Sequence, residues 1–147
     1  MIISTNSLNE ARKQIQKLKK EDKKVIVQAQ DEDFNRKILE DKDVDFLLSP
    51  ELHDRKDKLK ERDSGLNEVL CRIAARNNIK IGIELSKIKK KKEKERAVLL
   101  ARIMQNIKLC KRIGTELKIF GKYDKKDAFS LLLTLGASTS QAKKAVC

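Results

Sequence analysis

Residues 66–85, which read LNEVLCRIAARNNIKIGIEL, decide the fold of this chain. Apolar side chains recur there three and four positions apart, which predicts an amphipathic helix that begins near Asp63 or Ser64 and ends at Asn77-Asn78. The apolar run from Ile79 to Leu85 then has the length and composition of a buried strand. A helix joined to a buried strand is the building block of a parallel β-α repeat. The expected inner stripe of the helix consists of Leu66, Val69, Leu70, Ile73 and Ala74, with Glu68 and Arg72 on its outer face.

The same alternation of strand and helix extends along the whole chain. Strand-length apolar runs at residues 1–5, 24–28, 44–49, 79–85 and 117–121 each precede a segment with helical spacing. Ser7-Leu8-Asn9-Glu10 predicts a capping box at the first helix, and Ser138 with Gln141 predicts another at the last. Asp124 begins the helix before it. The first two helices are expected to bury Leu8, Ala11, Ile15 and Leu18, and Phe34, Ile38 and Leu39.

The fourth expected helix is the longest, running from about Glu93 to Ile113 with Gly114 as its C-cap. Its periodicity predicts that Leu100, Ile103, Met104, Ile107 and Cys110 point inward. The same spacing leaves Arg102, Gln105, Lys108 and Arg112 on the outside.

Five β-then-α units predict an α/β fold with a parallel sheet, right-handed crossovers and a binding rim at the carboxyl ends of the strands. Five strands are too few to close an eight-stranded barrel. We therefore expect one shortened TIM-like barrel domain over residues 1–147, in the form of a partial or open barrel. Its first strand, residues 1–5, is then a free edge that a partner or a second copy of the chain would cover.

Positive charge is concentrated in the second half of the sequence. Residues 1–74 carry 16 Lys and Arg against 16 Asp and Glu, whereas residues 75–147 carry 19 against 6. A lysine-rich genome also yields basic proteins, but it would not leave half of a chain neutral, so a polyanionic partner for the second half is the better interpretation. The N-terminus lacks the features of a signal peptide, and no run of eighteen apolar residues occurs, which together predict a soluble, cytoplasmic protein.

A lysine-rich segment after the fourth strand is the sharpest local feature. Residues 87–96 follow the strand directly, so we expect a basic loop at the binding rim; the alternative is a solvated loop without function. Its cations are Lys87, Lys89, Lys90, Lys91, Lys92, Lys94 and Arg96. Four of the five aromatic residues are expected in the core (Phe34, Phe46, Phe120 and Phe129), which argues against stacking on single-stranded bases and favours phosphate contacts to a folded RNA.

Sequence motifs for catalysis are missing. There is no Walker loop, GxGxxG or nucleophile elbow, and the odd number of cysteines at 71, 110 and 147 supports neither a disulfide framework nor a zinc site. His53 is the single histidine and is expected to be a solvated residue of a charged loop. Carboxylates of that loop, residues 51–57, are more simply explained by solubility and ion pairing than by magnesium binding. We predict that this chain has no catalytic residue and holds no metal or cofactor.

Several segments resemble ribonuclease P protein component 3 in order and spacing. They are residues 44–50 (VDFLLSP), 55–57 (RKD), 65–70 (GLNEVL), 74–86 (AARNNIKIGIELS), 96–100 (RAVLL), 106–112 (NIKLCKR) and, more weakly, 131–136. The order of these segments carries the resemblance, which covers about residues 22–146.

The resemblance implies a TIM-like barrel that does not itself cut RNA. Members of that family pair with the small component 2 subunit and support a catalytic RNA, which uses magnesium to remove 5′ leaders from precursor tRNA. It also implies a member shortened at its N-terminus, because typical members carry further β-α units ahead of this position. By position, Arg36, Arg55, Lys56 and Arg76 match basic residues expected to face RNA; the alternative for each is a surface ion pair.

Two other functions fit parts of the sequence. A generic structured-RNA-binding or scaffold protein would share the charge and the fold. A metal-dependent phosphoesterase on the same barrel would need clustered His and Asp residues, which a chain with one histidine supplies poorly.

Overall fold

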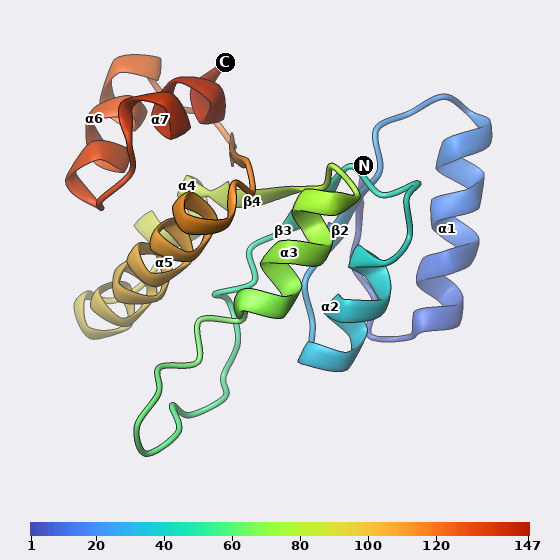
Figure 1. Cartoon of the computed structure of the whole chain (residues 1–147), viewed down its shortest axis with the longest axis horizontal. Coiled ribbons are helices and arrows are strands. Elements are labelled where there is room, and N and C mark those ends of the chain that lie inside the picture. The colour runs from blue at the N-terminus through green and yellow to red at the C-terminus, as the bar shows by residue number, and fades with distance from the viewer.

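The computed structural model describes residues 1–147 and contains a five-stranded parallel sheet in the order β1-β2-β3-β4-β5 (Figure 1). The prediction of an α/β fold with five parallel strands in an open sheet is confirmed, because each strand pairs in parallel with the next and the sheet does not close. The elements are β1 (Ile2–Ile3), α1 (Leu8–Lys20), β2 (Ile26–Gln28), α2 (Glu32–Leu39), β3 (Phe46–Leu48), α3 (Glu68–Arg76), β4 (Lys80–Glu84), α4 (Leu85–Lys89), α5 (Glu93–Ile113), β5 (Leu117–Phe120), α6 (Lys125–Thr134) and α7 (Thr139–Val146).

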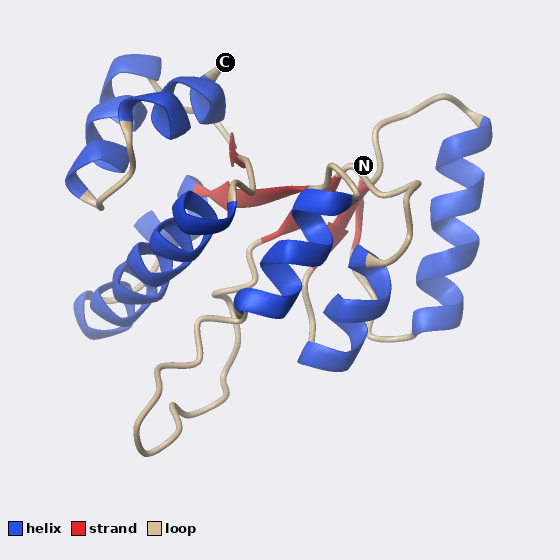
Figure 2. Ribbon diagram, viewed as in Figure 1, coloured by secondary structure: helices blue, strands red, loops and turns tan.

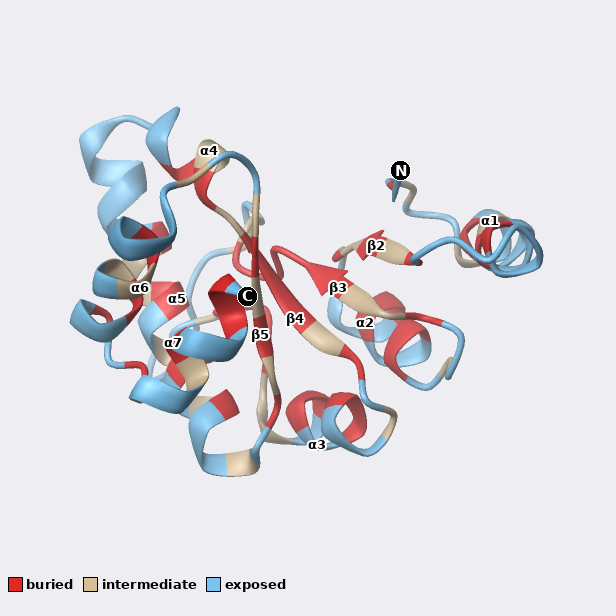
Figure 3. Ribbon diagram, turned by 90° about the horizontal axis from the view of Figure 1, so that it is seen from above, coloured by how far each residue is buried: buried red, intermediate tan, exposed pale blue.

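The two faces of the sheet differ in burial because side chains alternate along each strand. One register row crosses all five strands and is fully or almost fully buried; it consists of Ile3, Val27, Leu47, Ile81 and Leu117. This face packs on helices, and α1, α2 and α3 follow one another along it (Figures 2 and 3). The other face carries half-buried residues such as Ile26 and Phe46. The core therefore lies between the sheet and one helical layer.

Gly82 lets the aromatic rings on the second face approach the sheet. A Cβ at this position would lie 2.8 Å from the ring of Phe120 and 2.9 Å from Cδ1 of Leu48. The ring of Phe120 meets Phe46 edge to face, with the ring centroids 5.2 Å apart. Phe34 is buried as expected, whereas Phe46, Phe120 and Phe129 are only half-buried.

Helix termini follow the local signals that were expected. Ser138 and Gln141 form a complete capping box, and Gly114 ends α5 in the left-handed conformation with φ of 93°. The capping box at Ser7 is only half formed, because the Glu10 side chain accepts a hydrogen bond from Gln14 instead of from the backbone of Ser7. Asp124 caps α6 as predicted, and none of the helices has the length and apolar content needed to cross a membrane.

The predicted start of α3 and the predicted inner faces of α3 and α5 are wrong in part. Helix α3 begins at Glu68 with Asn67 as N-cap, because Asp63 and Ser64 belong to a loop that packs on α5. Val69 is 53% exposed instead of buried. On α5, Met104 is 48% exposed, since the buried stripe is rotated towards positions 99, 102, 103, 106, 107 and 110.

Candidate nucleic-acid interface

Residues 87–96 do not form the single basic loop that was predicted. Lys87 and Lys89 end α4, only residues 90–92 lie between helices, and Arg96 lies in the first turns of α5. Helix propensity of the lysines and the apolar contacts of Ile88 keep α4 helical. We call the exposed residues 89–92 the lysine turn; its side chains form no ion pairs.

Two cations next to the lysine turn have structural contacts. The ammonium group of Lys87 lies 3.5 Å from the carboxylate of Glu84. The Arg96 guanidinium donates hydrogen bonds to the carbonyl oxygens of Lys89 and Lys91, at 3.2 and 3.0 Å. Arg96 therefore fixes the backbone of the lysine turn. The lysine side chains of the turn are themselves exposed to solvent.

A cavity of about 610 Å³ opens beside the lysine turn. Its walls come from the loop after β3, from α4 and from α5, and they include Lys87, Lys90, Lys91 and Arg102. Asp54 and Glu95 are its acidic lining residues, so cations predominate. The carboxyl edge of the sheet therefore carries the expected positive surface, in accordance with the topology.

The prediction that Arg102 lies on the outside of α5 is wrong, because the residue is 7% exposed. Its guanidinium donates hydrogen bonds to the carbonyl oxygens of Glu51, His53 and Arg55, at 3.0, 3.0 and 3.2 Å. Its Nε atom is buried without a partner. The signal present in the sequence was the pair Arg102 and Asn106, one helical turn apart within an otherwise apolar stripe.

Burial also changes the protonation of the loop that Arg102 contacts. Glu51 is 2% exposed, and burial raises its pKa to about 7, against the opposing effects of a hydrogen bond from its own backbone and of the charges of Lys87 and Arg102. Glu51 is therefore partly protonated near neutral pH.

His53 is not the solvated residue that was expected, because its side chain is 5% exposed. The backbone N–H of Arg55 donates to Nδ1, and Nε2 lies 2.7 Å from the carbonyl oxygen of Asp63, which places the proton on Nε2. Burial, with the charges of Arg102 and Arg55, lowers the pKa of His53 and favours the neutral ring.

The family resemblance pointed to Arg55 and Lys56 in the same loop. Arg55 donates to the carboxylate of Asp63 at 3.0 Å and to the carbonyl oxygen of Gln30 at 3.4 Å. Burial opposes ionisation of Asp63, but hydrogen bonds from Arg55 and Gly65 outweigh it and lower the Asp63 pKa. The ion-pair alternative thus describes Arg55, whereas Lys56 is exposed and forms no ion pair.

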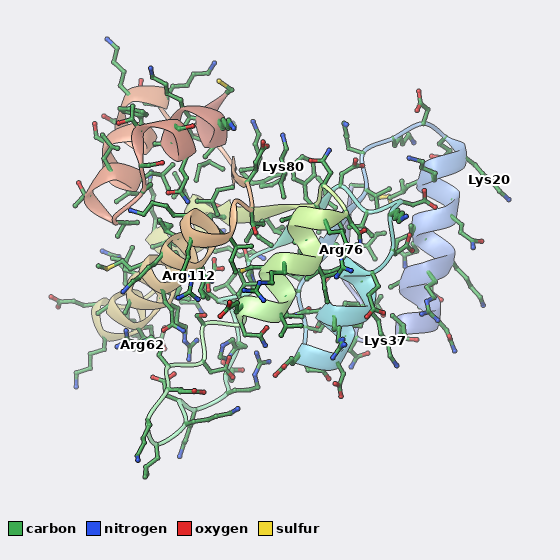
Figure 4. All side chains as sticks on the ribbon, viewed as in Figure 1. Lys20, Lys37, Arg62, Arg76, Lys80 and Arg112 are labelled. Carbon is green, nitrogen blue, oxygen red and sulfur yellow. The ribbon has the colours of Figure 1, made fainter.

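A second basic surface lies between α2 and α3. Arg36 and Arg76, both pointed to by the resemblance, line a groove of about 770 Å³ together with Arg72 and Lys42, which sequence reasoning did not select. Figure 4 shows the labelled Arg76 at the end of α3, on the side of α2. Arg36 pairs with Glu40 at 3.4 Å and Arg72 pairs with Glu68, whereas Arg76 forms no ion pair.

The two basic surfaces lie at opposite edges of the sheet. Arg76 ends the helix that leads into β4, whereas the lysine turn follows the end of β4. The structure therefore separates the predicted contacts into two groups instead of gathering them on one rim. No group of three or more His, Cys, Asp or Glu side chains is placed to hold a metal ion. The three cysteines are free, with Cys71 and Cys110 buried.

Comparisons with known proteins give the chain relatives of one kind. No model of a known protein family matches it. It is similar to Ribonuclease P protein component 3 of Methanococcus vannielii, with 32% identity over 117 residues that make up 80% of this chain and 48% of the relative. The protein of the same name from Methanocaldococcus jannaschii is 28% identical over 133 residues, which are 88% of this chain and 54% of the relative. The chain thus spans about half the length of these curated relatives.

The chain shares its fold with solved structures, of which two are described. A chain in the cryo-EM structure of archaeal ribonuclease P with mature tRNA matches with a TM-score of 0.80 and 26% identity, over 98% of this chain and 62% of that chain. An uncharacterised protein matches with a TM-score of 0.64 and 9% identity, over 95% of this chain and 36% of that chain, and shares the fold alone.

Proposed function

We propose that this chain, which belongs to the family of ribonuclease P protein component 3, is a non-catalytic RNA-binding subunit of an archaeal-type ribonuclease P. In this role it supports the catalytic RNA in removing 5′ leaders from precursor tRNA and does not cut RNA itself. The observation that carries the proposal is the match of 98% of the chain, at a TM-score of 0.80, to a chain of an archaeal ribonuclease P. The net charge of +13 supports a polyanionic partner.

Three groups of cations are the proposed RNA contacts. Lys89–Lys92 and Lys56 present ammonium groups without ion-pair partners at the carboxyl edge of the sheet, and Arg76 presents an unpaired guanidinium in the α2–α3 groove. Smaller contributions to RNA binding are expected from four cations whose side chains already pair with a carboxylate or a carbonyl oxygen: Arg36, Arg55, Lys87 and Arg96. We expect the unpaired cations to contribute most to RNA affinity, since they give up no existing partner on binding.

The proposal includes protein partners and a location. We propose that the chain works in the cytoplasm, contacts the small component 2 subunit, and meets precursor tRNA indirectly through the RNA. The edge strand β1 pairs only with β2, and Ile2 is 43% exposed while Ile3 is fully buried. Edge pairing with component 2 or with a second copy would cover this strand, and sedimentation at micromolar concentration with and without component 2 tests it. Magnesium serves the catalytic RNA, and the chain itself binds no cofactor.

Recovery of the chain from its own cells, followed by sequencing of the bound RNA, tests the proposal. We expect one dominant RNA, the ribonuclease P RNA. Reconstitution with that RNA and component 2 should lower the magnesium concentration needed for precursor tRNA cleavage, because added cations replace screening ions around packed phosphates. A mutation that inactivates the catalytic RNA should abolish cleavage in every mixture.

Two results would contradict the proposal. Capture of many structured RNAs without enrichment of ribonuclease P RNA would indicate the generic RNA-binding protein. Metal-dependent cleavage by the purified chain without RNA would indicate the phosphoesterase.

A further inference from the structure

Residues 50–66 form an arm between β3 and α3, which extends away from the sheet and the helices (Figures 1 and 2). Connections of this length without regular secondary structure are uncommon in compact domains and usually serve binding or catalysis. The outer residues of the arm, 56–62, are all exposed, and they line neither of the two basic cavities described above. The function of the arm therefore needs a separate explanation.

The base of the arm is closed by a contact that only glycine permits. Gly65 has φ of +83°, and a Cβ on it would lie 1.8 Å from the carbonyl oxygen of Pro50. The outgoing limb is held by the three hydrogen bonds that Arg102 donates to carbonyl oxygens. The returning limb is held by Gln105, which donates to the carbonyl oxygen of Arg62 at 3.0 Å, and by Asn106, which donates to that of Ser64 at 3.0 Å. Helix α5 thus anchors both limbs.

Contacts between the two limbs continue towards the tip. The Asp63 carboxylate accepts a hydrogen bond from the Arg55 guanidinium at 3.0 Å, and the backbone N–H of Asp63 donates to the Asp57 carboxylate at 2.8 Å. Beyond them, the backbone N–H of Glu61 donates to the carbonyl oxygen of Lys58 at 3.2 Å and closes a tight turn. The arm is therefore a braced structure whose conformation is set before any partner binds.

The tip of this braced structure presents one apolar side chain between cations. Leu59 is fully exposed, at 101%, which is the highest exposure of any large apolar residue in the chain. Lys58 and Lys60 flank it, and neither forms an ion pair. An exposed leucine at the end of a rigid arm gains most when a partner removes it from water.

We infer that the arm inserts its tip into a groove of structured RNA, with Leu59 against the sugar and base edges and Lys58 and Lys60 against phosphates on either side. The inference rests on the proposed RNA-binding function. It adds an apolar contact between Leu59 and the RNA to the phosphate contacts that the lysines are proposed to form. An apolar side chain flanked by cations suits a nucleic-acid groove. A protein partner suits it less, because lysine is depleted in the centre of protein interfaces.

Photo-crosslinking from position 59 tests the inference. The probes are a ribonuclease P RNA transcript with component 2 present, and an unrelated structured RNA of equal length. A benzoylphenylalanine in place of Leu59 should crosslink to RNA at a few neighbouring nucleotides. The same residue in place of Leu133, an exposed leucine on α6, should not. Crosslinking of position 59 to component 2 alone, or to nothing while the chain binds RNA, would overturn the inference.

Affinity measurements complete the test and separate it from the proposed function. Leu59→Asp should weaken binding of the ribonuclease P RNA about tenfold, whereas Leu133→Asp should leave it unchanged. If precursor tRNA cleavage is never stimulated but position 59 crosslinks to both RNAs, the proposed function fails and the arm contact stands. If cleavage is stimulated equally by Leu59→Asp and the unchanged chain, the arm contact fails and the proposed function stands.

Discussion

The arm and the lysine turn both follow strands at the carboxyl edge of the sheet, and both carry exposed lysines, but they are built differently. Backbone and side-chain hydrogen bonds fix the arm at its base, along its limbs and at its tip. The lysine turn has a fixed backbone and free ammonium groups. The arm offers a defined shape, whereas the turn offers charge with little geometry. Shape gives specificity and charge gives affinity that depends on salt.

Substitution of the glycine at the base of the arm should have the largest effect. Gly65→Ala introduces a Cβ 1.8 Å from the carbonyl oxygen of Pro50 and forces a positive φ on alanine. We expect a loss of at least about 4 kcal/mol of unfolding free energy, from steric overlap and backbone strain together. Gly136→Ala is the matched control, because Gly136 also has a positive φ but a Cβ there meets nothing within 4 Å. Urea unfolding of Gly136→Ala should show a loss of only about 1 kcal/mol of unfolding free energy. Equal losses in both variants would mean that the base of the arm is loosely packed.

Removal of the buried guanidinium should have the next largest effect. Arg102→Leu leaves the carbonyl oxygens of Glu51, His53 and Arg55 without their donor, so we expect a loss of about 3 kcal/mol of unfolding free energy. Trypsin should also cleave within residues 56–62 faster, because the outgoing limb of the arm loses its hydrogen bonds to α5. Arg72→Leu, at an exposed arginine that pairs with Glu68, should cost less than about 1 kcal/mol and leave trypsin cleavage unchanged. An arm that stays resistant to trypsin in Arg102→Leu would show that the contacts between its limbs suffice.

The buried carboxyl of the arm gives the stability a dependence on pH. Because Glu51 has a pKa of about 7 in the folded chain and an ordinary value of 4.5, its favourable contribution is full below pH 4.5 and lost as the pH rises through 7. Glu51→Gln should remove this loss, so the variant should gain up to about 3 kcal/mol relative to the unchanged chain between pH 5 and pH 8. Urea unfolding at each pH measures the difference.

The lowered pKa of His53 acts in the opposite sense, since its contribution is lost as the pH falls below the ordinary value of 6.5. Comparing Glu51→Gln with the unchanged chain at each pH cancels that second effect. Glu61→Gln, at an exposed carboxyl near the tip, is the control. A constant difference between Glu51→Gln and the unchanged chain at all pH values would show that Glu51 is solvated.

Sequence periodicity predicted those parts of the molecule whose determinants are local. The bounds of α5 and the cap at Ser138 depend on residues a few positions apart, and both were found. The arm was missed because its contacts join distant residues. Arg102 reaches carbonyl groups 47 to 51 positions earlier in the chain, and Asn106 reaches one 42 positions earlier.

The same difference explains the candidate site. The lysine-rich segment was visible as composition, and the resemblance to a family supplied Arg36 and Arg76. That these two arginines share a groove with Arg72 and Lys42 depends on the packing of α2 against α3, which no local pattern encodes. Likewise, an outward-facing arginine and a buried one look alike in a helical pattern, because the carbonyl groups that make burial favourable lie elsewhere in the chain.

Neutralisation of the lysine turn should have the smallest effect on the fold and a distinct effect on binding. Replacing Lys89, Lys90, Lys91 and Lys92 together by alanine should change the unfolding free energy by no more than about 0.5 kcal/mol, since these exposed side chains form no ion pairs. If they bind phosphates, a plot of log K against log salt for ribonuclease P RNA should become less steep, by about 0.9 for each phosphate that is no longer neutralised. The matched control replaces Arg12, Lys13, Lys17 and Lys20 of α1, which are also exposed and unpaired, and should leave the slope unchanged.

Leu59→Asp removes an apolar side chain, so part of its effect on affinity should persist at high salt, where phosphate binding is weak. An unchanged slope after neutralising the lysine turn would reject it as a binding element. The arm would then be the main RNA-binding element at this edge of the sheet.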